Sequence, residues 1–213
     1  CQGMDVSPGF IDIHLHGGGG CDFMDARQDA VETIAHTHAK YGTTSMLPTT
    51  LSSSPEQVID ALQCIQKAKD EYTGGSKILG AHLEGNFFSY KQKGAQDPKY
   101  IFPPTRANFE RIVNCISDIK MVSCAPEIEN ALNFSKEMRA KGIIMSIAHS
   151  DANYDEFICA IENGFNHITH LYNGNSWLNS PYYYCQIGVC EAGLLHDDIF
   201  VEVIADGQHL PIQ

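Results

Sequence analysis

Two histidines, His14 and His16, stand one residue apart at the end of an apolar, β-branched segment that stops at four consecutive glycines. Alternate side chains of a β-strand project to the same face, so a strand over 10–16 would aim both imidazoles at one shared metal ion. On a helix the same spacing separates the two rings by roughly 200°. His36 and His38 repeat the spacing within a helical pattern and are expected to be surface or packing residues. The alternative for the first pair is that it only closes a strand.

Other residues that could bind a metal close further segments with strand-like sequence. Glu84, His149 and His170 each end an apolar segment, and His209 follows another. In (β/α)8 barrels, catalytic groups gather at the C-terminal ends of the strands. Three histidines and one glutamate with open positions are typical of a mononuclear or binuclear hydrolytic metal site. Such a metal acidifies a bound water and polarises a carbonyl.

The elements that must position these groups alternate along the chain, which is typical of βα units around a parallel sheet. Strands are predicted over 10–16, 43–48, 78–84, 121–125, 143–149, 167–170 and 200–205. Helices are predicted over 29–41, 55–72, 105–115, 128–141 and 154–163. A closed (β/α)8 barrel takes eight units and about 250 residues. The predicted fold is therefore α/β, a metal-dependent TIM barrel that is truncated, with about seven of the eight βα units within residues 1–213.

Composition and charge argue against several classes of protein. The 213 residues, 43% of them hydrophobic, suffice for one core. A net charge of -12 without a basic stripe argues against a nucleic-acid partner, and the sequence has no apolar run of the ~20 residues that cross a membrane. The eight cysteines are scattered without a Cys-x-x-Cys pair, which favours reduced thiols in the cytoplasm. The first residue, Cys1, suggests a fragment; the alternative is the cysteine of a lipoprotein.

Ten short motifs resemble the amidohydrolase superfamily and, within it, the N-acetylglucosamine-6-phosphate deacetylase family. They lie, in order, at residues 8–17, 22–25, 42–45, 48–50, 82–85, 93–95, 125–127, 148–150, 169–173 and 204–209. The first is shared by many amidohydrolases, whereas 82–85 and 169–173 are specific to the deacetylases. The resemblance implies that residues 1–213 form an incomplete catalytic barrel, with its last strand and a small β-sandwich domain outside this segment.

The resemblance also implies roles for particular residues. Glu84, His149 and His170 would hold one metal ion, and His14 and His16 would serve a second. The residues that would contact the substrate are Ala95, Gln96, Asn173, Gly174 and His209. The general acid and base of the family is an aspartate at the end of the eighth strand, which is expected after Gln213. Asp206 is not its substitute, because it matches the seventh strand.

Three departures from the family bear on the substrate. Gln96 stands where a histidine is usual, and it can donate a hydrogen bond to a carbonyl but cannot carry a proton. Asn86 replaces a proline, a change that we expect to be minor. Residues 174–184 contain no arginine to bind a 6-phosphate, and their aromatic side chains suit an unphosphorylated sugar or, alternatively, packing on a partner subunit.

These observations predict an enzyme that deacetylates N-acetylglucosamine-6-phosphate to glucosamine-6-phosphate and acetate in amino-sugar catabolism. The alternatives are another amidohydrolase that acts on an unphosphorylated N-acetyl sugar or an N-acyl amide, and a non-catalytic barrel relative. The cofactor is a divalent metal, Zn, Fe, Co, Ni or Mn, with one or two ions per subunit. The expected partners are the small-molecule substrate and a second copy of the chain, whose substrate His209 would reach. We expect residues 1–213 alone to be inactive, because a barrel without its last unit exposes strand edges.

Overall fold

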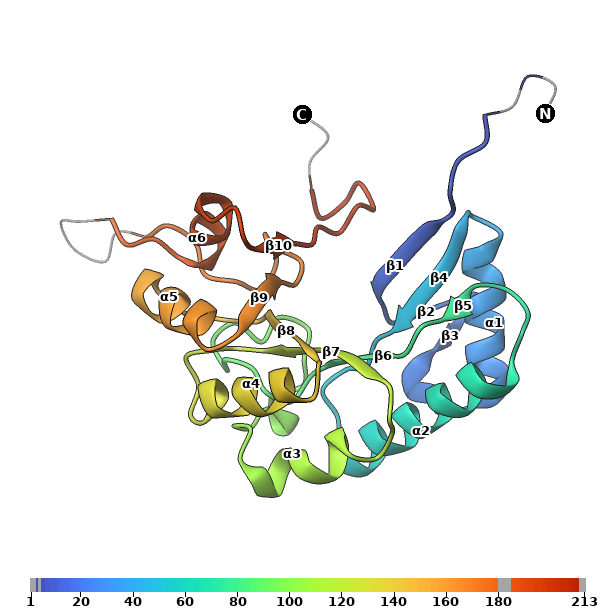
Figure 1. The fold of residues 1–213 in the computed structure, drawn as a ribbon, viewed down its shortest axis with the longest axis horizontal. Coiled ribbons are helices and arrows are strands. Elements are labelled where there is room, and N and C mark those ends of the chain that lie inside the picture. Colours follow the sequence, from blue (N-terminus) through green and yellow to red (C-terminus); the bar gives the residue numbers. More distant parts are fainter. Residues whose placement is uncertain (1–2, 4, 180–184, 211–213) are drawn as a thin grey trace.

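The computed structural model describes residues 3, 5–179 and 185–210 of the chain (Figure 1). Within them, strands alternate with helices, which confirms the predicted α/β class. Cys1 and residues 180–184 of the aromatic segment lie outside the described residues, so the predictions made for them stay predictions.

A three-stranded parallel sheet forms the first part of the fold. Its strands, in order across the sheet, are β1 (Phe10–Leu15), β4 (Thr43–Pro48) and β5 (Lys77–Ile78). The elements that connect them are the hairpin β2 (Gly17–Gly18) and β3 (Cys21–Asp22), the 3-10 helix η1 (Phe23–Asp25), and the helices α1 (Gln28–Ala39) and α2 (Pro55–Glu71). The hairpin, which the sequence analysis did not predict, follows directly from the strand that carries His14.

A five-stranded parallel sheet forms the second part. Its strands, in order across the sheet, are β6 (Ala81–Glu84), β7 (Ile119–Cys124), β8 (Ile144–Ile147), β9 (Phe165–Ile168) and β10 (Phe200–Val201). The intervening helices are η2 (Pro98–Tyr100), α3 (Arg106–Val113), α4 (Ala131–Ala140), α5 (Tyr154–Glu162) and α6 (Val189–Leu195). Helix α6 was not predicted.

The predicted strand 78–84 is wrong as a single element, because it is divided between the two sheets. Gly80 has a φ of +154°, and a Cβ at this position would lie 2.5 Å from the carbonyl oxygen of Asp118. This backbone, which only glycine readily adopts, breaks the strand. Residues before Gly80 pair with β4 and residues after it pair with β7.

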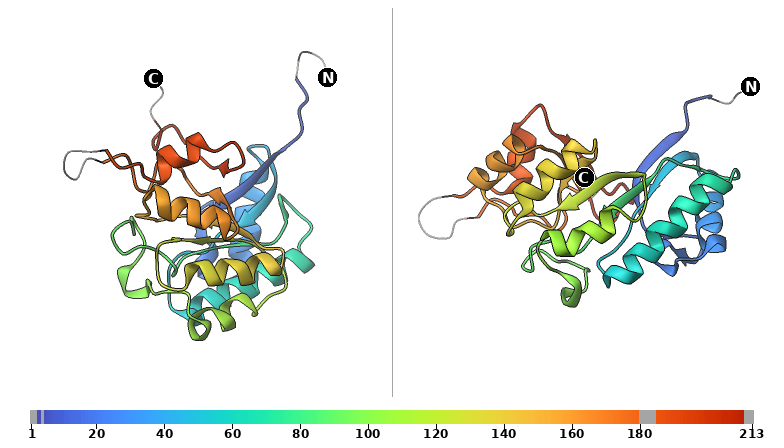
Figure 2. Two further views of the ribbon diagram at one scale, coloured as in Figure 1. Left: turned by 60° about the vertical axis from the view of Figure 1, so that its left-hand side comes forward. Right: turned by 60° about the horizontal axis from the view of Figure 1, so that its bottom comes forward.

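The two sheets follow one another as an arc of parallel strands in chain order (Figures 1 and 2). A parallel bridge between Thr49 and His82 joins them. Helices α1 to α5 lie along the outside of the arc. Among the described residues β1 does not pair with β10, so the strands do not close into a ring. The (β/α)8 barrel therefore stays a prediction.

Five predicted strands end earlier than expected, three of them by two residues or more. Strands β8 and β9 stop two residues before His149 and His170, because both histidines have a left-handed backbone, with φ of 46° and 34°. Strand β10 is shorter than the predicted 200–205, although Glu202 still exchanges backbone hydrogen bonds with the end of β9.

Helix α2 illustrates how the sequence directs an element against the sheet. Its Ser54 side chain accepts a hydrogen bond from the backbone N–H of Gln57, and Pro55 occupies the first turn, so the start is as predicted. One face of the helix is buried in the core through Val58, Ala61, Leu62, Ile65 and Ala68. This spacing of three and four residues puts the apolar side chains on one side. Burial of each larger side chain contributes about 1.5–3 kcal/mol.

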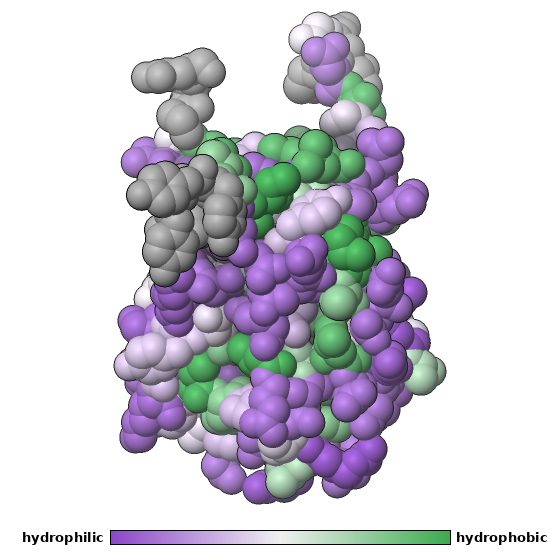
Figure 3. All heavy atoms as spheres, turned by 90° about the vertical axis from the view of Figure 1, so that its left-hand side faces the viewer, coloured by the Kyte–Doolittle hydropathy of each residue, from purple (hydrophilic) through white to green (hydrophobic). Residues whose placement is uncertain are grey.

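Apolar side chains are exposed at both ends of the arc. Phe10 and Ile11 on β1 are 70% and 62% exposed, and Phe200 on β10 is 69% exposed. Elsewhere the surface is mixed, and Figure 3, which faces the α5 and α6 side, shows small apolar patches broken up by polar side chains. No helix in the described part of the chain is both long and apolar enough to span a membrane.

Candidate metal centre

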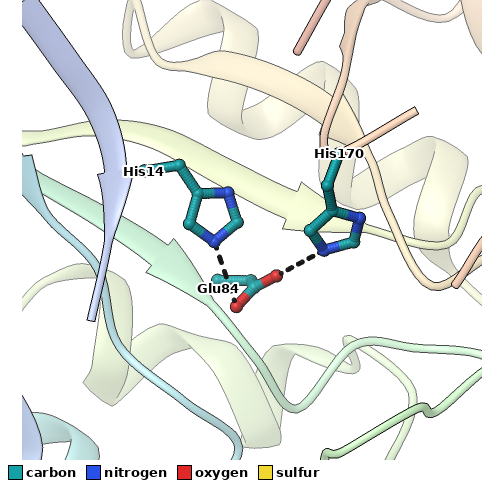
Figure 4. A group of neighbouring side chains, drawn as sticks. All are labelled: His14, Glu84 and His170. Atoms are coloured by element: carbon teal, nitrogen blue, oxygen red, sulfur yellow. Dashed lines mark hydrogen bonds and ion pairs between the residues drawn. The ribbon is translucent and has the colours of Figure 1, made fainter. Parts of the chain in front are cut away.

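The strand ends bring the five predicted metal ligands together around one carboxylate, that of Glu84. Glu84 is the last residue of β6 and is 1% exposed. Oε2 of Glu84 lies 3.5 Å from Nε2 of His14 and 3.3 Å from Nε2 of His16. Oε1 lies 3.4 Å from Nε2 of His149 and 3.1 Å from Nε2 of His170. Figure 4 shows His14 and His170 pointing at the carboxylate from opposite sides.

The opposite ring nitrogens explain why three of the four histidines turn Nε2 inward. Three Nδ1 atoms each lie beside an oxygen that can only accept: His14 3.2 Å from the Glu202 carboxylate, His16 3.3 Å from the Thr49 carbonyl and His149 2.9 Å from the Gln92 carbonyl. Nδ1 of these rings therefore carries a hydrogen, and in the neutral ring Nε2 presents a lone pair to Glu84. Nδ1 of His170 is buried without a hydrogen-bond partner among the described residues.

Lone pairs that face a carboxylate repel it unless a cation lies between them. The ligand atoms of His14, Glu84 and His170 lie within 4.8 Å of one another. Imidazole nitrogens with a carboxylate oxygen suit Zn, Fe, Co, Ni or Mn comparably well. The residues present therefore fit a divalent metal ion, and the donor set leaves its identity open.

The backbone at two of these histidines is strained. His149 and His170 occupy the left-handed region with φ of 46° and 34°. A residue with a Cβ in this region costs of order 1–3 kcal/mol, which the surrounding structure must offset. At both positions the chain leaves its strand and turns, so the ring reaches Glu84. Such strain is concentrated at functional sites.

The charges of His14 and Glu84 stabilise each other. Burial opposes protonation of His14, but the charge of Glu84 prevails and raises the pKa of His14 to about 10. Burial also opposes ionisation of Glu84, yet the charge of His14 and hydrogen bonds from the histidines hold the pKa of Glu84 well below its usual range. Without a metal, protonated His14 thus supplies positive charge beside the carboxylate.

Three residues close to the centre were not predicted as part of it: His82, His167 and Glu202. His82 lies two residues before Glu84 on β6, so strand alternation could have placed both on the inner face. Its Nδ1 donates to the Ile13 carbonyl at 3.1 Å, and Nε2 lies 2.8 Å from the Ser123 hydroxyl. Burial, with the charge of His14, lowers the pKa of His82 to about 3.

The predicted substrate residue Gln96 is buried beside the centre. Its Oε1 accepts a hydrogen bond from the backbone N–H of Ser52 at 2.8 Å, which fixes the orientation of the amide because N–H can only donate. Its Nε2 then points to Glu84, 3.4 Å from Oε2. Gln96 thus presents a held N–H donor at the edge of the metal centre.

Asn86 has a larger structural role than the minor one expected from the sequence. It has a φ of 71°, which a proline, restricted to about −65°, cannot adopt. Its backbone N–H donates to the Ser52 hydroxyl at 2.9 Å, and its Nδ2 donates to the Ser53 and Tyr100 carbonyls at 2.8 Å each. Asn86 therefore holds together the loops on which Gln96 depends.

The remaining predicted substrate residues divide into two groups. Gly174 lies against the centre, since a Cβ there would come within 2.8 Å of His149 Nδ1. Asn173 follows the His170 turn and donates its backbone N–H to the His170 carbonyl at 2.8 Å. Ala95 and His209 are exposed, and no hydrogen bond or ion pair joins the His209 side chain to the metal centre within residues 5–179 and 185–210. His209 instead contacts Asp206, with Nδ1 2.8 Å from Oδ2.

Two surface hollows lie elsewhere on the molecule. One of about 530 Å³ is lined by residues of α4 and α5 together with Glu127, and one of about 600 Å³ is lined by α1 and Gly19. Neither is lined by the four histidines or Glu84. The chemistry of the donor set, rather than the size of a hollow, identifies the candidate site.

Comparisons with known proteins point to one family. Residues 6–213 match the amidohydrolase family. The N-acetylglucosamine-6-phosphate deacetylase of Vibrio furnissii is 37% identical over 209 residues, which cover 97% of this chain and 51% of the relative. The N-acetylgalactosamine-6-phosphate deacetylase of Escherichia coli O157:H7 is 30% identical over 206 residues, which cover 96% of this chain and 54% of the relative.

A solved structure agrees with these relatives. It is that of a mutant N-acetyl-D-glucosamine-6-phosphate deacetylase from Mycobacterium smegmatis in complex with N-acetyl-D-glucosamine-6-phosphate. It has a TM-score of 0.86 at 28% identity and matches 95% of this chain and 51% of its own. The chain thus spans about half the length of the curated relatives it matches.

Proposed function

The chain belongs to the amidohydrolase family, and we propose that the protein containing it deacetylates N-acetylglucosamine-6-phosphate, releasing acetate and glucosamine-6-phosphate. The resemblance to the deacetylases that the motifs indicated is confirmed by the relatives and the solved structure. The observation that carries the proposal is the convergence of four histidine Nε2 atoms on the buried Glu84 carboxylate.

The proposed metal ligands are Glu84, His149 and His170 for one ion, with His14 and His16 for a second. A divalent cation held there supplies an acidified water and polarises the acetamide carbonyl. Gln96 is placed to donate its amide N–H to that carbonyl, because Ser52 holds the amide in one orientation. Expulsion of the amine requires a proton, for which we propose the aspartate expected after Gln213.

The proposed barrel would place that aspartate at the open side of the arc. Strands β1 and β10 are the unpaired ends, and apolar side chains on both are exposed. With β5 and β6 counted as one strand of the barrel, one further parallel strand between β1 and β10 would cover these side chains and complete a ring of eight. The length of the relatives, about twice that of the chain, supports the presence of such a strand in the full-length protein.

Recognition of the 6-phosphate is proposed to rest on Lys93. No lysine or arginine follows Lys141 in the sequence. The loop that contains Lys93 touches the centre: Gln92 accepts from His149, and a Cβ on Gly94 would lie 3.4 Å from the His149 ring. The neighbouring Lys91 is paired with Asp151 at 2.7 Å, whereas no carboxylate lies within ion-pair distance of Lys93 in the described part of the chain.

An unphosphorylated N-acetyl sugar is the second candidate substrate, and the aromatic residues of 174–184, a segment without lysine or arginine, favour it. The test is release of acetate by the full-length protein from N-acetylglucosamine-6-phosphate and from N-acetylglucosamine, each with and without a chelator. Chelator-sensitive turnover of the phosphorylated sugar supports the proposal. Turnover of only the unphosphorylated sugar supports the second candidate. Turnover of neither would contradict both and leave another amidohydrolase or a non-catalytic relative.

N-acetylgalactosamine-6-phosphate is a necessary third substrate in this assay, because one relative is named for it. The two sugar phosphates differ in the configuration of one hydroxyl group. A preference between them would therefore report contacts to the sugar ring and not to the phosphate or the acetamide.

A further inference from the structure

Glu202 is a buried carboxylate that the proposed reaction does not use. It directly follows β10, and its side chain is 10% exposed. Its backbone N–H donates to the Ile168 carbonyl and its carbonyl accepts from the Leu171 N–H, both at 2.9 Å. These two hydrogen bonds, to the last residue of β9 and to a residue just after it, fix the backbone of Glu202 and so the position from which its side chain extends.

The carboxylate of Glu202 reaches two histidines on different strands. Oε2 lies 3.2 Å from Nδ1 of His14 on β1, and Oε1 lies 2.8 Å from Nε2 of His167 on β9. Glu202 therefore spans the side of the arc on which β1 and β10 do not pair in the described part of the chain.

A carboxylate that accepts from Nδ1 determines what the other nitrogen of the ring can do. With the hydrogen held on Nδ1, the neutral His14 ring presents its Nε2 lone pair to the centre. The same contact restricts rotation of the ring and increases the basicity of the ligand nitrogen. Among the residues that the structure describes, the partner of His14 Nδ1 is the Glu202 carboxylate and not a carbonyl as at His16 and His149, so the orientation of this ring depends on a side chain.

We propose that Glu202 is a positioning residue that fixes the ring of His14 toward the metal centre, and thereby sets the metal affinity of the part of the centre formed by His14 and His16. The inference rests on the proposed metal-dependent function but not on the identity of the substrate. It connects the ends of the arc to metal binding, because Glu202 and His14 are 188 residues apart in the sequence.

Three substitutions separate position from charge. E202Q keeps the reach and an acceptor oxygen but removes the charge. E202D keeps the charge but shortens the side chain by one methylene. E202L has a similar size but neither an acceptor oxygen nor a charge. If Glu202 acts by positioning His14, metal affinity falls in the order wild type, E202Q, E202D, E202L, and E202L loses about 10- to 100-fold.

The measurement is Zn²⁺ affinity and stoichiometry of the full-length protein, determined by competition with a chromophoric chelator. The same variants are made in a His14→Ala background, where Glu202 has no ligand to position. There E202L is expected to add no further loss, because effects that act through one residue do not add. E202D maintains a carboxylate beside His167 and so serves as the variant if E202L does not fold.

Three outcomes would overturn the inference. A folded E202L or E202D that binds Zn²⁺ as tightly as wild type shows that His14 needs no positioning. An E202D that binds more tightly than E202Q shows that charge, and not reach, is what matters. An equal loss with and without His14 assigns Glu202 a general structural role. Wild-type protein that binds no metal would instead overturn the proposed function, so the two failures are distinguishable.

Discussion

The rings of His14 and His82 lie 4.9 Å apart, yet their pKa values are shifted in opposite directions, to about 10 and about 3. Both side chains are buried, which favours the neutral form of each. His14 contacts the carboxylates of Glu84 and Glu202, whereas the ring nitrogens of His82 contact the Ile13 carbonyl and the Ser123 hydroxyl. The His14 ring therefore holds a proton that a metal can replace, whereas the neighbouring His82 ring stays neutral.

The first prediction concerns the stability of the metal-free protein. The pKa of His14 is raised from 6.5 to about 10, so its stabilising contribution is present below pH 6.5 and is lost as the pH rises toward 10. The pKa of Glu202 is lowered from 4.5 to about 2, so its contribution is lost as the pH falls below 4.5 toward 2. These two groups predict maximal stability between pH 4.5 and 6.5.

Urea unfolding in the presence of a chelator, measured across this range, tests that prediction. The free energy of unfolding is expected to decrease above pH 6.5, and a His14→Gln variant is expected to have a flatter profile there. A wild-type stability that increases toward pH 10 would contradict it.

The second prediction concerns protons released by the metal. Because His14 is protonated below about pH 10 without a metal, binding of Zn²⁺ through its Nε2 is expected to displace one proton. Affinity should therefore rise with pH between neutrality and about pH 10. Calorimetric titration in two buffers of different ionisation enthalpy gives the number of protons released. After the heat of Zn²⁺ binding to each buffer is subtracted, a binding enthalpy that is the same in both buffers would exclude this release.

The third prediction is that Glu84→Gln destabilises the metal-free protein and abolishes metal-dependent turnover. It removes the carboxylate that faces the charged His14, and removal of one partner of a buried pair costs about 3–5 kcal/mol. Glu71→Gln, at the exposed end of α2, is the matched control and is expected to leave both properties unchanged. Denaturant unfolding and metal content are the measurements; a stable E84Q that still binds Zn²⁺ would refute the assignment of Glu84.

The fourth prediction is that Asn86→Pro is poorly tolerated in this chain. Proline cannot adopt the φ of 71° and lacks the N–H and the amide that bond to Ser52, Ser53 and Tyr100. The loss of three hydrogen bonds alone costs about 3 kcal/mol. Asn86→Gly keeps the backbone conformation and the N–H, so it should cost less. Equal stabilities of N86P and N86G in denaturant unfolding would show that the loop adopts another conformation.

The fifth prediction concerns phosphate. Lys93→Met in the full-length protein is expected to raise KM for N-acetylglucosamine-6-phosphate by about 10- to 100-fold, the value of one charge-assisted hydrogen bond. KM for the unphosphorylated sugar should not change. Lys120→Met is the control, because Lys120 lies near the start of strand β7, whereas the metal centre lies at the ends of the strands. If K93M and K120M have the same ratio of the two KM values, Lys93 does not contact the phosphate.

The local pattern of the sequence was sufficient to bring out the five residues proposed as metal ligands, but not His82, His167 or Glu202. Alternation along a strand placed His14 and His16 together, because side-chain direction in a strand depends only on neighbouring residues. Glu84, His149 and His170 were marked by their position at or just after the end of an apolar segment. The helix predicted over 55–72 likewise begins at the residue where α2 begins. The class of fold and the family followed from the same local motifs.

Only the tertiary structure decided how these groups act on one another. The contact between His14 and Glu202 joins the first and last strands, and nothing in either local sequence indicates it. The left-handed turns at His149 and His170 and the break at Gly80 depend on neighbours distant in sequence. The charge on His14 has the same origin, because desolvation and the position of opposite charges exist only once the strands have come together.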